Sequence, residues 1–217
     1  MFLTKKRVNS VAIRSLLATL FVIVVLLLSR NTSANDLGLR ASGQINYKHF
    51  GGGVTKLSQE HRFDLEELAL NEVFTDLGFH YRLAGWLTTG ASYRMVFAEK
   101  QDSWKLEHRP HADVVVTARR LFYLDLTWRA RLEYRIRGED LSVRVRKRLK
   151  TTFKRVPMKP FVAAEVFLPY TGTPERTRAF FGFSPLENLS TFYLLEADHD
   201  QGTEFKNIVG INYKFNL

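Results

Sequence analysis

The sequence has no cysteine among its 217 residues and only six prolines. Without cysteine the chain can form neither a disulfide framework nor a thiolate site. Beyond its N-terminal segment it also lacks an apolar run of the ~20 residues that a membrane-spanning helix needs. If the rest of the chain is integral to a membrane, it must be a closed β-barrel, because only helices and closed barrels pair all their backbone groups inside lipid.

Acidic residues are few beside basic ones: the chain has 22 of the former and 32 of the latter, a formal net charge of +10. A surplus of this size is typical of proteins that bind nucleic acid. However, five of the basic residues and none of the acidic residues lie in residues 1–34, so removal of this segment would halve the net charge. The remaining arginines alternate with apolar residues instead of clustering, as in Leu126–Leu149. We therefore expect no nucleic-acid partner.

The first 34 residues have the layout of a secretory signal peptide, with a basic start, an apolar run and a small-residue cleavage site. These parts are Lys5, Lys6, Arg7 and Arg14, then Leu16–Leu28, then Thr32 and Ala34. The apolar run is shorter than the ~20 residues of a spanning helix, although a membrane anchor that is never removed is the alternative. We predict cleavage after Ala34, with residues 35–56 as an N-terminal extension or extra strands and residues 57–217 as the folded domain.

Alternation of apolar and polar residues runs through the rest of the chain, with the period of two that indicates β-strands. At the C-terminus the two faces would carry Val209, Ile211, Tyr213, Phe215 and Leu217 against Gly210, Asn212, Lys214 and Asn216. The stretches "TDLGFHYRL" and "LTTGASYRMVF" show the same alternation. A helix would not produce this pattern, so the sequence predicts an all-β fold.

Strand-like segments recur at short intervals, as expected for an antiparallel up-and-down transmembrane β-barrel. We predict ten of them, at about 57–69, 74–83, 86–98, 108–119, 121–136, 141–150, 160–168, 176–183, 190–197 and 205–217. A single additional strand in residues 35–56 would make the number odd, which single-chain bacterial barrels avoid. That segment is therefore expected to be an extension, or else two short strands that raise the total to twelve.

The segment Leu121–Arg137 separates charge from apolar side chains most strictly. One face would carry Phe122, Leu124, Leu126, Trp128, Ala130, Leu132, Tyr134 and Ile136, and the other Asp125, Arg129, Arg131, Glu133, Arg135 and Arg137. In a soluble sandwich the apolar face would be the core, whereas in an outer-membrane barrel it would meet lipid and the charged face would line the lumen. A slip of one residue would cost about 2–4 kcal/mol for each arginine brought to the bilayer midplane, so the alternation fixes the register.

Arginines and carboxylates on these polar faces form the candidate site. They comprise Arg129, Arg131, Glu133, Arg135, Arg144, Arg146, Arg148, Glu165, Arg176, Arg178, Asp125 and Asp76. Crowded arginines need negative partners, so the sequence predicts a lumenal ladder of arginines bridged by carboxylates. Such a ladder can brace a narrow barrel, favour anions in a pore, or bind a specific anionic ligand.

Two parts of the chain carry a family resemblance. Within Glu66–Phe97 these are "FTDLGFHYRL", the tight turn after it and the "GASYR" strand; downstream they are "WRARLEYR", "RVRKRL", "AAEVF" around Glu165, and "ERTR" with Arg176 and Arg178. Over about residues 57–217 the sequence resembles a group of bacterial outer-membrane β-barrel proteins catalogued only as a domain of unknown function. The resemblance implies an outer-membrane barrel and supplies no catalytic residues.

Side chains that could perform chemistry are scattered. His80 and Ser92 would share the polar side of one hairpin, as a serine nucleophile and its base must, but Asp76 and Arg82 surround them equally. The sequence shows no phosphate-cradling glycine loop, zinc spacing or paired-carboxylate signature. We predict no catalytic residues, no metal site and no cofactor.

Taken together, these patterns favour a non-enzymatic outer-membrane β-barrel protein, structural or a small passive pore, with an Arg/carboxylate-lined lumen. Two alternatives stay open: an outer-membrane enzyme that modifies lipid or lipopolysaccharide, and a soluble periplasmic ligand-binding β-barrel. The expected location is the outer membrane of a Gram-negative bacterium, reached through a cleaved signal peptide. The expected partners are outer-membrane lipids, lipopolysaccharide and the barrel-assembly machinery, with a small anionic solute as a further candidate.

Overall fold

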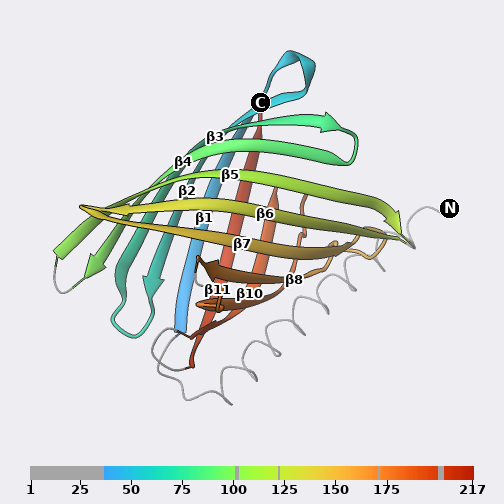
Figure 1. Cartoon of the computed structure of the whole chain (residues 1–217). Helices are drawn as coiled ribbons and strands as arrows, with labels where there is room; N and C mark the ends of the chain where they lie inside the picture. Colours follow the sequence, from blue (N-terminus) through green and yellow to red (C-terminus); the bar gives the residue numbers. More distant parts are fainter. Residues whose placement is uncertain (1–36, 101–102, 122, 171, 200–202) are drawn as a thin grey trace, which may run out of the picture.

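The computed structural model describes residues 37–100, 103–121, 123–170, 172–199 and 203–217 (Figure 1). The predicted signal peptide, residues 1–34, lies outside these described residues. Within them, no helix has the length and apolar character needed to cross a membrane. The described chain consists of β-strands, short connections and one 3-10 turn, η1, at Phe50–Gly52.

In the described residues eleven β-strands form one closed barrel, which confirms the predicted all-β barrel (Figure 1). The strands are β1 Leu37–Lys48, β2 Gly53–Asp64, β3 Ala69–Ala84, β4 Leu87–Lys100, β5 Ser103–Leu121, β6 Leu124–Arg137, β7 Asp140–Phe153, β8 Phe161–Pro169, β9 Arg176–Phe183, β10 Leu189–Asp198 and β11 Glu204–Asn216. Strands adjacent in the chain pair antiparallel, so the chain runs up and down around the barrel. The barrel closes where β1 pairs with β11 in parallel, from Leu37 opposite Asn207 to Asn46 opposite Asn216.

The predicted number of strands, ten or else twelve, is wrong for the described residues, because β1 is a single additional strand. Its outward positions include Ala41 and Gly43, which weaken the apolar alternation that would have marked it as a strand. The parity argument failed as well, since a parallel pair lets an odd number of strands close. The other ten strands lie where the sequence placed them, with ends that differ by a few residues.

The barrel has two rims. We name the rim at which β11 ends the C-terminal rim. It also holds the β1–β2, β3–β4, β7–β8 and β9–β10 turns. At this rim the backbone N–H of Lys48 donates a hydrogen bond to the carbonyl oxygen of Leu217 (3.3 Å). The other rim holds the β2–β3 and β6–β7 turns. In the β1–β2 turn Gly51 and Gly52 have φ values of 79° and 93°, which residues with a Cβ rarely adopt. This requirement explains the first two of the three glycines there.

The two faces of the barrel wall differ sharply. Exposed large apolar side chains line the outward face around the barrel, among them Leu77, Phe79, Tyr81, Val114, Trp128, Leu132, Tyr134, Val162, Ile211 and Phe215. The inward face carries buried charged residues, among them Glu107, Arg109, Asp113, Arg131, Glu133, Arg144, Arg146, Glu165, Arg178 and Glu196. The molecule therefore places its charge inside and most of its apolar surface outside.

One sector of the interior is apolar. Phe161, Ala163, Phe180, Phe192 and Leu194, from β8, β9 and β10, form a buried cluster. Gly210 on β11 makes room for it, because a Cβ at that position would lie 2.1 Å from Cζ of Phe192. This packed sector leaves the remaining interior to the ionic groups.

Candidate functional site: the ionic lumen

The ionic lumen starts from the pairing of β6 with β7, whose inward faces both carry arginine. Their register sets Arg129 opposite Arg148, Arg131 opposite Arg146, and Glu133 opposite Arg144. Like charges directly opposite each other on a sheet are destabilising. Carboxylates from other strands must therefore reach these arginines.

Glu165 on β8 reaches arginines from three other strands. Its Oε1 accepts hydrogen bonds from Nη2 of Arg129 (2.9 Å) and Nη2 of Arg146 (3.1 Å), and Nη1 of Arg178 lies 3.7 Å from its Oε2. The residue is only 2% exposed. Burying an ion is expensive unless opposite charges and hydrogen bonds compensate it, and here the guanidinium groups supply both. One carboxylate thus ties β8 to β6, β7 and β9.

Glu133 on β6 is completely buried and continues the chain of contacts. It accepts hydrogen bonds from Arg144 and, at 3.4 Å, from Nη1 of Arg146. Arg146 therefore bridges Glu133 and Glu165. Arg144 also donates to Glu175, in the connection between β8 and β9, which extends the contacts toward the rim opposite the C-terminus.

Glu107 on β5 binds a second set of arginines near the rim opposite the C-terminus. Its carboxylate accepts hydrogen bonds from Nε of Arg109 (2.8 Å), Nε of Arg135 (2.7 Å) and Nε of Arg137 (2.6 Å). Nη1 of Arg135 lies 4.0 Å from Oε1 of Glu175. The set on Glu107 is therefore continuous with the contacts of Glu133 and Glu165.

Across β9 and β10 the ion pairs follow the strand register. Arg178 lies opposite Glu196 and donates a hydrogen bond to it, while Arg176 lies opposite Asp198 and donates to that carboxylate. Nη1 of Arg176 also lies 3.3 Å from Oε1 of Glu196. Because Arg178 contacts Glu165 as well, this pair of strands joins the same network.

Carboxylates of β3 and β5 bind another group of cations, which come from β4, β5 and β6. Asp113 accepts both hydrogen bonds of a bidentate pair from Arg131, at 2.8 and 2.9 Å. Asp76 accepts a hydrogen bond from Nε of Arg94 (2.7 Å). Nε2 of His111 lies between them, 3.7 Å from Asp76 and 3.9 Å from Asp113. The result is a compact ionic cluster beside the main network.

Next to the parallel β1–β11 pair, which is the seam of the barrel, a third group of ion pairs joins β1, β2 and β3. Arg40 donates to Glu60, which also accepts from Nε of Arg62 (2.9 Å), and Nη1 of Arg62 donates to Glu72 (2.6 Å). The guanidinium of Arg62 also lies 4.3 Å from the ring centroid of Phe74. Ion pairs thus brace the strands on the β1 side of the parallel pair.

Two buried phenylalanines sit among the arginines. Phe74 has the guanidinium groups of Arg62, Arg94 and Arg109 within 5.8 Å of its ring centroid, and Phe167 has those of Arg144, Arg146 and Arg178 within 4.8 Å. A guanidinium over an aromatic face gains about 0.5–2 kcal/mol. These rings fill space between arginines while keeping favourable contact with them.

The structure distributes the predicted site residues unevenly. One continuous set of contacts includes Arg129, Glu133, Arg135, Arg144, Arg146, Glu165, Arg176 and Arg178, and a separate cluster includes Arg131 and Asp76. Asp125 does not bridge arginines: it lies near the start of β6, at the C-terminal rim, and pairs with Lys154. For Arg148, no carboxylate of the described residues lies within 4.0 Å.

Sequence reasoning missed many partners of these arginines. The missed carboxylates are Glu60, Glu72, Glu107, Asp113, Glu175, Glu196 and Asp198, and the missed arginines are Arg40, Arg62, Arg94, Arg109 and Arg137. One signal was available: "EHRPHAD" places Glu107, Arg109, His111 and Asp113 on one strand face. The pairing across β9 and β10 depends on register, which the sequence does not reveal.

His80 and Ser92, the candidate nucleophilic pair of the β3–β4 hairpin, pack against bare backbone. Nε2 of His80 lies 3.5 Å from Oγ of Ser92. A Cβ on Gly90 would come within 2.3 Å of the His80 ring, and one on Gly78 within 2.0 Å of the Ser92 hydroxyl. The strand backbone therefore occupies the space beside both side chains. Among the described residues, no three histidine or carboxylate side chains form a metal-binding group.

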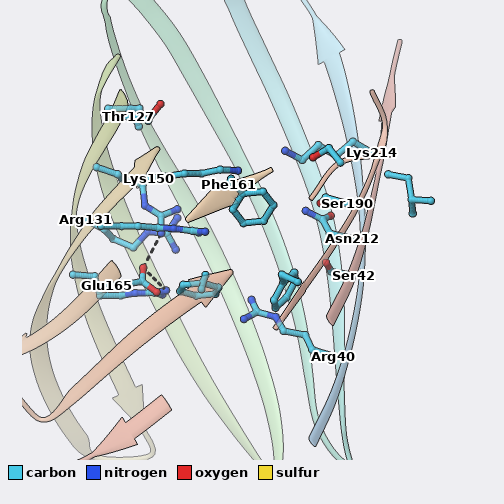
Figure 2. Close-up of a pocket in the computed structure, with 18 of the residues that line it drawn as sticks. Arg40, Ser42, Thr127, Arg131, Lys150, Phe161, Glu165, Ser190, Asn212 and Lys214 are labelled. Atoms are coloured by element: carbon cyan, nitrogen blue, oxygen red, sulfur yellow. Dashed lines mark hydrogen bonds and ion pairs between the residues drawn. The ribbon is translucent and has the colours of Figure 1, made fainter. Parts of the chain in front are cut away.

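Open space remains on both sides of the ionic groups. Toward the C-terminal rim a cavity of about 400 Å³, here named the basic cavity, is bounded in part by the β9–β10 turn (Figure 2). A cavity of about 230 Å³ lies among the arginines of Glu107 near the other rim. Arg62, Arg94 and Arg146 line both cavities, so these three residues form a waist between them.

Comparison with known proteins adds one finding. No curated protein matches the chain. A family model described as a protein of unknown function (DUF2490) matches residues 39–187, which run from β1 to the β9–β10 turn. The matched part contains most of the ionic lumen, and the chain belongs to this family of proteins of unknown function.

Proposed function

We propose that the protein is a non-enzymatic β-barrel of the bacterial outer membrane, with a structural role and a lumen that its own ion pairs close. The observation that carries this proposal is the inverted polarity of the barrel. Large apolar side chains such as Leu77, Leu132 and Ile211 are exposed on its outward face, and charged side chains are buried inside. Such a surface suits hydrocarbon and is costly in water.

A charged residue in the middle of β7 departs from this pattern. Lys147 lies in the middle of β7, between Arg146 and Arg148, and is exposed on the outward face. Its neighbours across the strands are Ala130 and Val166. A lysine in this place can extend its long stem so that the ammonium group reaches a polar layer. The proposal therefore accommodates a single outward lysine on this strand.

Membrane fractionation tests the location. We expect the mature protein to be found with outer membranes, to need detergent for extraction, and to migrate differently on a gel before and after heating, because a closed barrel resists unfolding by detergent at low temperature. A chain that stays in solution without detergent would contradict the proposal. It would favour a soluble ligand-binding barrel instead.

Conductance tests the closed lumen. We expect the purified protein to give no porin-like current steps in a planar bilayer, because guanidinium groups of the waist and buried carboxylates such as Glu133 and Glu165 occupy the interior. A porin of known conductance, inserted under the same conditions, serves as the control. Steady porin-sized steps from the wild-type protein would contradict the structural role.

A narrow anion-selective passage is the second candidate, and the shared lining of the two cavities favours it. Small movements of Arg62, Arg94 or Arg146 would join the spaces that these residues separate. In that case the wild-type protein would carry a small current with a preference for chloride over potassium. Arg129 lines one cavity and Arg144 lines the other. The current would change when either arginine is replaced by alanine.

A further inference from the structure

The basic cavity contains cations that form no ion pair with a described carboxylate, although Glu165 and Glu187 also line it. Among the residues that the structure describes, no carboxylate oxygen lies within 4.0 Å of the charged groups of Arg148, Lys150 or Lys214. All three line the basic cavity. The arginines of the opposite rim differ in this respect, because Glu107 alone accepts hydrogen bonds from three of them.

Aromatic rings hold two of these cations in place. The guanidinium of Arg148 lies 4.5 Å from the ring centroid of Phe180, and Nζ of Lys150 lies 3.9 Å from that of Phe161. An aromatic face attracts a cation through its quadrupole but carries no net charge. The rings therefore position Arg148 and Lys150 without neutralising them. Nε of Arg148 is also buried and has no hydrogen-bond partner among the described residues.

The three cations share one cavity. Arg148 and Lys150 lie two residues apart on β7, and Lys214 lines the same space from β11. Like charges held together in a partly desolvated space raise the energy of the empty site. An anion that enters this space would remove the repulsion.

The facing wall supplies neutral hydrogen-bonding groups. Strand register places Asn212 on β11 between Ser42 on β1 and Ser190 on β10, and all three residues line the basic cavity. Figure 2 shows Lys214, Ser190, Asn212 and Ser42 on one side of the cavity and Lys150 on the other. Hydroxyl and amide groups beside cations are the combination that binds oxyanions.

We propose that the basic cavity binds a phosphate group, with Arg148, Lys150 and Lys214 as its cationic contacts and Ser42, Ser190 and Asn212 as neutral donors. A phosphate monoester carries a charge of about −1.5 to −2 near pH 7 and offers three acceptor oxygens, which suits several cations together. The volume of about 400 Å³ leaves room for the group that carries the phosphate. This inference deepens the proposed function. It rests on that function in one respect only: the interior of the barrel must be open at the C-terminal rim.

Titration calorimetry on the full-length mature protein in neutral detergent tests the site. The probes are inorganic phosphate and glycerol phosphate, at constant ionic strength set with chloride. The wild-type protein is expected to bind, and the Lys150→Gln/Lys214→Gln variant is expected to lose at least about tenfold in affinity, since it loses two charge-assisted contacts. Lys147→Gln is the matched control: it removes a lysine from the same strand on the opposite face, and its affinity should equal that of the wild-type protein.

A second arm identifies the source of the phosphate. The protein is placed in phosphatidylcholine bilayers with and without phosphatidic acid, and its unfolding temperature is measured. A rise that needs phosphatidic acid and is lost in the double variant assigns the site to a lipid headgroup, whereas binding of the free probes assigns it to a soluble ester. Either result supports the site.

Three results would overturn the inference: a wild-type protein that binds neither the free probes nor the lipid, a folded double variant with unchanged affinity, or an equal loss in Lys147→Gln. Circular dichroism and the gel shift on heating establish that each variant is folded. A soluble chain that binds phosphate would refute the outer-membrane location alone. A membrane barrel that binds no phosphate would refute this inference alone.

Discussion

Replacing Glu165 by alanine is expected to cost about 3–5 kcal/mol of unfolding free energy, the range found when one partner of a buried ion pair is removed. Arg146 would retain Glu133 and Arg178 would retain Glu196, but no other described carboxylate lies within 4.0 Å of Arg129. The loss therefore leaves buried guanidinium charge uncompensated. Urea unfolding of the detergent-solubilised barrel, followed by the gel shift and by circular dichroism, measures the change.

Two further variants make this result specific. Glu187→Ala removes a carboxylate whose side chain is 93% exposed and whose partner is the exposed Lys159, and it should leave the unfolding midpoint unchanged. Replacing both Glu165 and Arg129 by apolar residues of similar size, Leu and Met, should recover part of the lost stability, because it also removes the orphaned charge. If Glu165→Ala were as mild as Glu187→Ala, the network would not brace the barrel.

Placing arginine on the outward face is the second change with a large expected effect. Val114 lies on β5 with 42% of its surface exposed, flanked across the strands by Thr89 and Ala130. If this face meets lipid, Val114→Arg should cost about 2–4 kcal/mol near the bilayer midplane. The unfolding free energy in phospholipid bilayers measures the effect.

The neighbouring residue provides the matched control. Val115 points inward and lines the basic cavity opposite Arg129, where a new carboxylate would meet water and a positive charge. Val115→Glu should therefore cost clearly less than Val114→Arg in a bilayer. Equal costs, or a Val114→Arg variant as stable as the wild-type protein, would contradict a lipid-facing exterior.

The sequence predicted the barrel because alternation is a local property. In β6 one apolar residue separates each charged residue from the next between Arg129 and Arg137, and this period alone assigns Arg129 and Trp128 to opposite faces. The same argument placed Glu165 on the face opposite Val162 and Val166, as the structure confirms. No knowledge of pairing partners was needed for either assignment.

The ion pairs between strands could not be predicted from alternation. Arg146 meets Glu165 and Glu133 because three strands lie at a particular register, and a shift of two residues would preserve every face while changing every pair. Closure was equally hidden, since β1 and β11 are far apart in the sequence and pair in parallel. The unpartnered state of Arg148 is also a property of the assembled interior.

The parallel seam has a consequence for the chain's connectivity. Had the first and last strands been antiparallel, their free ends would meet at one rim and a short loop could join them. Here Leu37 lies beside Asn207 and Asn46 beside Asn216, so the start of β1 and the finish of β11 are separated by the full height of the barrel wall. At about 3.3 Å per residue, any linker that reorders the strands by circular permutation would need roughly a strand's length of extended chain. Such a permutant would have to thread that linker along the outer wall or through an interior already filled by side chains.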